Sequence, residues 1–196
     1  MIRSYGLKAS SAVCGAAVEL TLGTVKKYLT GRDEIRLLDI GCGGGAFLKK
    51  LPPSFKSFGV DYNENAPIKV DISYEKLPFP NSSFDIVTAW QVFEHLENPF
   101  FAGREIERVL ISGGLCIISV PNIRRAHSRL SFLVRGALPR WSNYNDHLFV
   151  PLKSVLKKKV FSGCVIRERK YADGSVPLFS SSIWFAKNEY YVFQKL

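Results

Sequence analysis

The sequence predicts a doubly wound α/β fold, in which helices cover both faces of a mostly parallel sheet. Short apolar runs of strand length alternate with helical patterns along the chain, and such alternation is typical of parallel sheets built from strand–helix–strand units. The run LCIISVP (115–121) is continuously apolar, as expected for a strand that is buried on both faces. The run RLLDI (36–40) leads directly into four closely spaced glycines. Ligands of such sheets bind beyond the carboxyl ends of the strands, where a turn of this kind lies.

The first element is expected to be an amphipathic helix within residues 1–30. Val18, Leu22, Val25 and Leu29 recur there at 4-3-4 spacing, which places them on one helix face. A cleaved signal peptide is the minor alternative, because the segment lacks a sustained apolar core before a small-residue cleavage site.

The remaining elements follow in chain order. Asn98 and Pro99 are typical of the start of a helix, and the pair Gly113-Gly114 predicts its end. Pro151 predicts the start of another helix, and Gly163 its end. Strands are expected at residues 36–40, 57–61, 68–72, 84–90, 115–121, 164–171 and 182–188, and further helices at 46–51, 99–110, 130–138 and 151–163.

Composition restricts the class of protein. A chain of 196 residues with 46% hydrophobic and 22% charged residues is typical of one ordinary globular domain. The four cysteines lie far apart and form neither a CxxC pair nor a zinc-ligand pattern. This spacing favours reduced thiols in a cytoplasmic protein over a disulfide framework or a zinc site.

The glycine-rich stretch at 41–46 predicts a cofactor loop. It satisfies the pattern GxGxxG/A, and Asp61 lies 20 residues after Gly41, so both features match a dinucleotide-binding fingerprint. Asp39 argues for a different cofactor, because an acid beside a helix start repels a pyrophosphate. The cationic ammonium and sulfonium of S-adenosylmethionine suit that acid, and bare glycine backbone allows close approach. A tight turn without any ligand is the remaining alternative.

Four segments of the chain resemble the class I S-adenosylmethionine-dependent methyltransferases. They are LLDIGCGGGAFL, GVDYNE, DISYEKLPFPNSSFDIVTAWQVFEHLENP and EIERVLISGGLCIISVPN, in the family's order and spacing between residue 36 and about residue 170. The resemblance implies a Rossmann-like, seven-stranded sheet and S-adenosylmethionine as the cofactor. It assigns Asp39, Gly41 and Gly43 to the methionine portion, Asp61 to the ribose, Asp71 and Ile72 to the adenine, and Trp90 and Gln91 to the region of the sulfonium.

On this reading the chain is a single methyltransferase domain with four parts. We expect an N-terminal helix (1–30), a cofactor-binding core (31–121), a lid over the acceptor (122–150), and a C-terminal helix and strand pair (151–196). The chain departs from the family at residues 62–67, which are too few for the helix that usually lies there.

His95 is the best-placed candidate for a general base, since it follows the fourth strand near the expected methyl group. The alternative is that His95 holds its loop by a hydrogen bond to the backbone. The segment QVFEHL also resembles one in which the ubiquinone-biosynthesis O-methyltransferases bind a divalent ion through two glutamates and a histidine. Glu94 and His95 match, but Gln91 stands in place of the first glutamate. Because an amide is a weaker ligand for a hard cation, we predict no metal.

The region that covers the acceptor carries the positive charge of the chain. Residues 122–170 hold 12 of the 27 Lys and Arg residues and two of the 17 acids, so the rest of the chain has 15 of each. This excess lies among apolar residues at helical spacing in 130–138, a pattern typical of helices on anionic membranes. We therefore expect a small-molecule acceptor that is anionic or carried by a lipid, and a peripheral contact with anionic membrane through 122–170. The following polar residues are candidates for the acceptor site: Asn143, Tyr144, Asp146 and His147.

Three other functions compete with a small-molecule methyltransferase. An RNA methyltransferase agrees with the basic charge, but the sequence contains no NPPY- or PCQ-type tetrapeptide and no RNA-binding module, so nucleic acid is not the expected partner. A non-catalytic binding protein of the same fold disagrees with the intact glycine loop and acids. A nicotinamide-dependent enzyme is the third alternative. A binding measurement with S-adenosylmethionine and NAD separates these classes.

Overall fold

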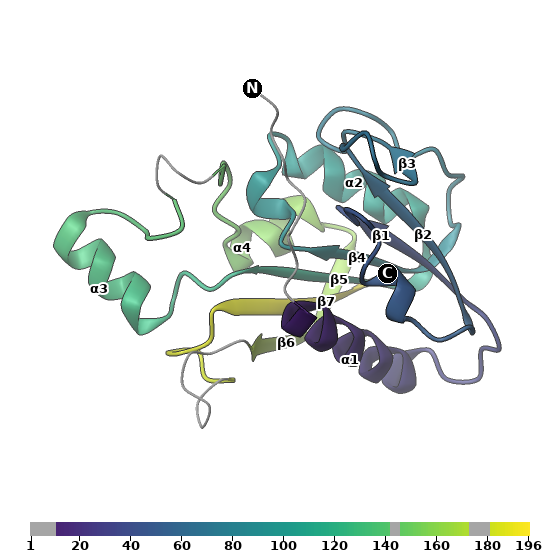
Figure 1. The fold of residues 1–196 in the computed structure, drawn as a ribbon, viewed down its shortest axis with the longest axis horizontal. Helices are drawn as coiled ribbons and strands as arrows, with labels where there is room; N and C mark the ends of the chain where they lie inside the picture. Colours follow the sequence, from purple (N-terminus) through teal and green to yellow (C-terminus); the bar gives the residue numbers. More distant parts are fainter. Residues whose placement is uncertain (1–10, 142–145, 173–180) are drawn as a thin grey trace.

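The computed structural model describes residues 11–141, 146–172 and 181–196, and contains a single seven-stranded sheet (Figure 1). The predicted doubly wound α/β fold is confirmed. The strands are β1 (Ile35–Ile40), β2 (Phe55–Asp61), β3 (Ile68–Lys69), β4 (Phe84–Trp90), β5 (Leu110–Pro121), β6 (Cys164–Ala172) and β7 (Asn188–Lys195). The helices are α1 (Ser11–Tyr28), α2 (Pro99–Val109), α3 (Ala126–Arg135) and α4 (Lys153–Val155), which continues as the π-helical turn η3 (Leu156–Val160). Two 3-10 turns, η1 (Leu48–Lys50) and η2 (Phe93–His95), complete the set.

The order of the strands places a ligand crevice beside β1. It runs β3-β2-β1-β4-β5-β7-β6, and only β7 is antiparallel to its neighbours. The chain therefore winds outward from β1 to β3 and then returns to start again at β4 on the other side of β1. Ligands of open α/β sheets bind at such a switch point, at the carboxyl ends of the strands.

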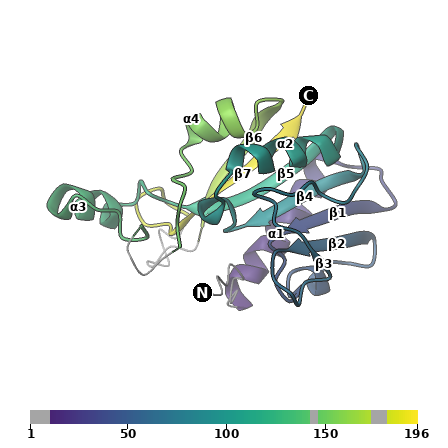
Figure 2. The same ribbon diagram turned by 90° about the horizontal axis from the view of Figure 1, so that it is seen from above.

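Helices cover both faces of the sheet, as the alternation along the strands requires (Figure 2). Leu37 belongs to a hydrophobic cluster that contains Cys14 and Ala17 of α1, whereas the next residue, Leu38, belongs to a cluster with Ile106 of α2. Successive side chains of a strand point to opposite faces, so one strand supports both clusters.

Helix α2 begins and packs as its sequence predicts. The side chain of Asn98 accepts a hydrogen bond from the backbone amide of Phe101 at 3.1 Å, with proline in the first turn. Gly103 lets the helix approach η3 closely, because an added Cβ would lie 2.2 Å from the carbonyl oxygen of Val160.

Four predicted boundaries are wrong. The helix expected at 46–51 is only the turn η1, and the expected third strand (68–72) pairs with β2 only at Ile68–Lys69. Residues 182–187 form turns and bends instead of the expected strand, with the backbone amide of Ala186 donating to the carbonyl of Ser182 at 2.8 Å. The last strand begins only at Asn188 because the run after it pairs with β5 and β6 on its two sides.

The fourth wrong boundary lies at the end of α2. The pair Gly113-Gly114 was expected to end the helix, but β5 already starts at Leu110, and the two glycines lie inside that strand. The register shifts there: Phe84 pairs with Leu110 and Ile86 pairs with Leu115. The extra residues on β5 form a bulge, in which Gly113 has a φ of 77°.

Two further expectations can be checked against the helices. Residues 62–67 contain no helix, as their small number predicts. Among the residues that the structure describes, no helix is both long and apolar enough to cross a membrane.

Candidate functional site

The glycine turn after β1 is shaped by its backbone. Gly41 has a φ of 71° and Gly43 a φ of 50°, values that favour glycine. A Cβ at Gly41 would lie 2.5 Å from Cγ2 of Val92. The turn is held to β2, because the amides of Gly41 and Cys42 both donate to the carbonyl of Val60, at 2.9 and 3.2 Å. The predicted loop is therefore built so that no side chain separates a ligand from its backbone.

Asp61 joins the end of β2 to this turn. Its side chain is 3% exposed, and its two carboxylate oxygens accept hydrogen bonds from the amides of Gly43 at 2.9 Å and Asn63 at 3.0 Å. Each carboxylate oxygen has further acceptor capacity, so the same group can also accept from ribose hydroxyls. Asp61 thus holds the loop and faces the cavity described below.

Asp39 lies deeper, near the end of β1. It is 2% exposed, and its Oδ1 accepts a hydrogen bond from the hydroxyl of Thr88 on β4 at 2.7 Å. Burial raises the pKa of Asp39 to about 7, and the charge of Asp61 adds to that rise, whereas the hydrogen bond from Thr88 lowers it. A positively charged ligand group near Asp39 would favour the ionised carboxylate.

A cavity of about 260 Å³ opens at the carboxyl ends of β1 and β2. The structure brings five of the predicted site residues to its wall: Gly41, Asp61, Asp71, Ile72 and His95. At the far wall Asp71 forms a turn in which its Oδ1 accepts from the amide of Ser73 at 2.9 Å, and the neighbouring Ile72 is buried. An acid, an apolar side chain and a glycine turn therefore face one hollow, which suits a nucleoside with a polar sugar and a flat base.

Four predicted residues lie outside this wall: Asp39, Gly43, Trp90 and Gln91. The ring of Trp90 is 6% exposed and packs against Phe47 and Tyr190, with ring centroids 5.5 and 6.2 Å away. Gln91 has a φ of 54°, a strained value for a residue other than glycine. Its amide donates to the Oγ of Ser119 at 3.0 Å, which holds this conformation.

Arg140, which the sequence analysis did not single out, links the lid to the sheet. Its Nη1 donates to Oε1 of Gln91 at 3.2 Å and to Oδ1 of Asn188 at 2.9 Å. The guanidinium therefore lies where β4 ends and β7 begins. A five-donor group at this position suits an acceptor with carboxylate or phosphate oxygens.

His95 has the geometry of the alternative role, in which its ring holds the loop by a hydrogen bond to the backbone. Its Nδ1 donates a hydrogen bond to the carbonyl oxygen of Asp146 at 3.0 Å, which ties η2 to the last part of the lid. Burial lowers the pKa of His95, so the ring is neutral at neutral pH. A neutral ring that lines the cavity is also the form that a base requires, so its role as a base stays a prediction.

A buried acid and a second histidine accompany His95. The carboxyl of Glu94 is 1% exposed, and neither of its oxygens has a hydrogen-bond partner within the described parts of the chain. Burial raises the pKa of Glu94 to about 8, against the opposing charge of Arg140. Burial also lowers the pKa of His147 to about 4. One ligand atom from each of Glu94, His95 and His147 lies within 4.8 Å of the others, a spacing that one cation can bridge.

Sequence reasoning about a metal missed His147, because it compared only the QVFEHL segment. The fold brings the rings of His95 and His147 to a centroid distance of 4.7 Å, across 51 intervening residues. The other two candidates for the acceptor site, Asn143 and Tyr144, lie outside the described residues.

Comparison with known proteins agrees with this site. Residues 38–118 match the family model described as a methyltransferase domain. A probable S-adenosylmethionine-dependent methyltransferase of Mycobacterium tuberculosis is 35% identical over 104 residues, which are 47% of this chain and 37% of that protein. A ubiquinone biosynthesis O-methyltransferase of Rhizobium leguminosarum is 26% identical over 153 residues, which are 69% of this chain and 61% of that protein. The chain thus spans less than two thirds of the length of both relatives.

A solved structure shows the same fold over nearly the whole chain. The S-adenosylmethionine-dependent methyltransferase from Archaeoglobus fulgidus superimposes with a TM-score of 0.62 at 21% identity, over 91% of this chain and 94% of that one. The predicted resemblance to the class I S-adenosylmethionine-dependent methyltransferases is therefore confirmed over residues 38–118, and the Rossmann-like sheet is confirmed over nearly the whole chain.

Proposed function

We propose that this chain, with its methyltransferase domain at residues 38–118, transfers the methyl group of S-adenosylmethionine to an oxygen or nitrogen of a small acceptor. We propose further that the acceptor is anionic or carried by a lipid. The four described cysteines are free and buried, which supports a cytoplasmic location for this activity.

The observation that carries the proposal is the cavity at the carboxyl ends of β1 and β2. Asp61, Asp71 and the turn at Gly41 all reach it, although they come from three separate places in the chain. Asp61 is positioned to accept from ribose hydroxyls, and the wall at Asp71 and Ile72 is positioned for adenine.

The sulfonium of the cofactor supplies an activated methyl group when it is bound. The residues of the chain then have to align the acceptor and exclude water, since holding two reactants in line lowers the barrier by itself. Gln91 and Arg140 lie on the acceptor side of β4 and are joined by a hydrogen bond. They supply a fixed polar surface against which an acceptor can be oriented. His95 would take a proton only from an acceptor hydroxyl or ammonium.

The charge around this side supports an anionic acceptor. Arg140 lies beside Gln91 and Asn188, and residues 122–170 carry the whole positive excess of the chain. A field of one sign at the mouth of a cleft raises the local concentration of a ligand with the opposite charge. An RNA substrate would respond to the same field, so it is the alternative that the assay must separate.

The test combines binding and transfer. Calorimetry with S-adenosylmethionine and with NAD should show binding only of the former. Transfer of a labelled methyl group should then be measured with small carboxylated and phosphorylated acceptors, with lipid extracts and with total RNA. NAD binding without S-adenosylmethionine binding would overturn the cofactor. Binding without transfer to any extract fraction would favour a non-catalytic protein, and labelling of RNA alone would replace the acceptor class.

A further inference from the structure

Helix α3 exposes a set of large apolar side chains. Figures 1 and 2 both show it standing away from the sheet and the other helices. The exposed residues and their exposed fractions are Leu130 at 64%, Phe132 at 57%, Leu133 at 82% and Val134 at 73%. Scattered exposed apolar residues are common, but four within five positions of one helix form a patch, which marks an interaction site.

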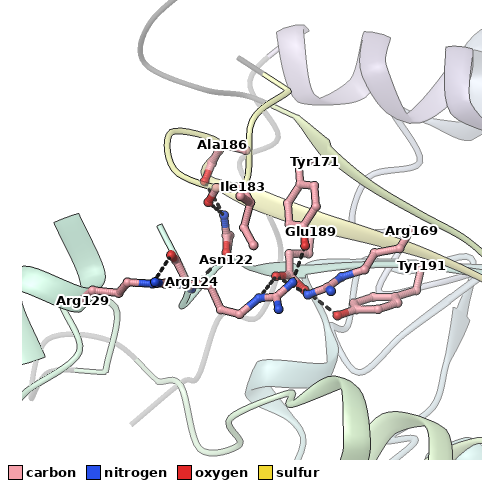
Figure 3. Close-up of polar contacts among 9 residues, drawn as sticks. All are labelled: Asn122, Arg124, Arg129, Arg169, Tyr171, Ile183, Ala186, Glu189 and Tyr191. Carbon is pink, nitrogen blue, oxygen red and sulfur yellow. Dashed lines mark hydrogen bonds and ion pairs between the residues drawn. The ribbon is translucent and has the colours of Figure 1, made fainter. Parts of the chain in front are cut away.

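The base of α3 is firmly held, so the helix presents these side chains from a fixed position (Figure 3). The Nδ2 of Asn122 donates to the carbonyls of Ile183 and Ala186, at 2.8 and 2.9 Å. Arg129 donates from Nε to the carbonyl of Arg124 at 2.8 Å. The two bonds of Asn122 join the residues before α3 to the segment that precedes β7, and the bond of Arg129 closes the first turn of the helix.

Three charged residues, Glu189, Arg169 and Arg124, extend this support into the sheet. Glu189 on β7 is 5% exposed and accepts from Nη2 of Arg169 through both carboxylate oxygens, at 2.8 and 2.9 Å. It also accepts from Nε of Arg124 at 3.3 Å. One buried acid therefore fixes two arginines at the edge of the surface, as Figure 3 shows.

A basic groove adjoins the apolar helix. The groove encloses about 410 Å³, and Ile123 lies both in its wall and in the wall of an apolar hollow of about 490 Å³ on the flank of α3. Five basic residues line the groove: Arg124, Lys153, Lys157, Lys158 and Arg169. Its single acid is Glu189, which is already bonded to two of the arginines. The groove thus keeps a strong positive excess directly beside exposed hydrocarbon.

We propose that α3 and this basic groove form a docking surface for an anionic membrane. The apolar side chains of α3 would enter the boundary between headgroups and acyl chains, while the groove would receive the phosphate oxygens of a lipid headgroup. Apolar residues interleaved with lysine and arginine are what an anionic bilayer surface attracts. A second copy of the chain fits less well, because it would place like charges opposite one another.

The test uses vesicles of phosphatidylcholine alone and vesicles with about 30% phosphatidylglycerol, in co-sedimentation with the full chain. The protein should bind the anionic vesicles, and binding should weaken strongly between about 0.05 and 0.5 M salt. The double variant Leu133→Ser/Val134→Ser should weaken binding about tenfold or more. Phe100→Ser on α2, at a site that is 39% exposed, is the matched apolar control and should bind as the wild type does.

A double substitution of two lysines tests the groove. Lys157→Ala/Lys158→Ala should weaken vesicle binding roughly fivefold for each lysine, whereas Lys49→Ala/Lys50→Ala on η1 should leave it unchanged. Trp184 reports the contact by fluorescence, because it is 48% exposed and its ring centroid lies 4.4 Å from the Arg129 guanidinium carbon. Its emission should shift to the blue on anionic vesicles and not on phosphatidylcholine.

Several results would overturn the proposal. Absence of binding to anionic vesicles at low salt is one, and unchanged binding of both α3 and groove variants is another. A dimer in sedimentation that Leu133→Ser/Val134→Ser dissociates, without vesicle binding, would assign the surface to a second copy. S-adenosylmethionine binding should stay the same in every variant, so failure of this proposal leaves the proposed function standing.

Discussion

Protonation of Asp39 should control how tightly the cofactor binds near neutral pH. The carboxyl is buried, its pKa is raised to about 7, and it lies at the end of the strand that leads into the glycine turn. If only the ionised form attracts the ammonium of S-adenosylmethionine, the apparent dissociation constant equals the intrinsic one divided by the ionised fraction. That fraction is about one tenth at pH 6 and about three quarters at pH 7.5. Affinity should therefore rise about eightfold over this range.

The assay is calorimetric titration with S-adenosylmethionine at several values between pH 6 and 7.5, because the ammonium of an amino acid loses its own proton near pH 8. Thr88→Val removes the hydrogen bond that lowers the pKa of Asp39, so its affinity profile should move to higher pH. Thr21→Val is the matched control, since this buried threonine donates only within α1, to the carbonyl of Ala17. Asp39→Asn should bind weakly at every pH.

The pH dependence of folding stability gives an independent test of the raised pKa of Asp39. The folded pKa of Asp39, about 7, lies above the ordinary aspartate pKa of 3.8. The folded state therefore binds more protons than the unfolded state between these values, and Asp39 makes the ligand-free protein less stable as pH rises through this window. Affinity and stability should move in opposite directions. An affinity that is flat from pH 6 to 7.5, or equal in the wild type and Asp39→Asn, would refute a role for Asp39 in binding the ammonium.

Three further predictions concern the neighbouring residues. Asp61→Ala should weaken S-adenosylmethionine binding by about 1–3 kcal/mol, measured by calorimetry beside the exposed control Asp33→Ala; unchanged affinity would contradict the ribose assignment. His95→Asn keeps a side-chain donor for the carbonyl of Asp146 but cannot act as a base, so low turnover in both His95→Asn and His95→Ala would indicate a base, and full turnover in the asparagine variant alone would indicate a loop-holding role. Burial raises the pKa of Glu94 from the ordinary glutamate value of 4.5 to about 8. As pH rises between these values, the stability of the fold should therefore fall by up to about 1.4 kcal/mol per pH unit. Glu94→Gln should reduce that slope in thermal melts with a chelator present, and an unchanged slope would show that Glu94 ionises freely.

The cofactor side of the fold could be predicted because its signals are local. β4 has the predicted bounds, 84–90, since a mostly apolar run between polar residues defines it within one segment. The positive φ of Gly41 follows from the same logic, because only glycine tolerates that turn without strain. Asp61 could be placed from its position at a strand end alone.

The other side depends on contacts between distant segments. The strand expected at 182–188 and β7 at 188–195 are both aromatic and β-branched in character, and pairing of Tyr190 with Ser119 of β5 decides between them. Arg140 and His147 belong to no sequence motif. They become site residues only because the lid returns to the end of β4 and the start of β7. The same holds for Thr88, whose bond to Asp39 crosses from β4 to β1.

Three departures from ordinary folding rules lie at the end of β4 and in the lid, and they support a division of labour. Gln91 has a strained φ, the buried carboxyl of Glu94 lacks a partner within the described residues, and Leu133 on α3 is 82% exposed. Each of these features costs stability, whereas the cofactor loop meets its local requirements with backbone hydrogen bonds and glycine. Costs of this kind persist where function requires them. We therefore expect the end of β4 and the lid to decide the identity of the acceptor, so substitutions there should change the acceptor while cofactor binding is preserved.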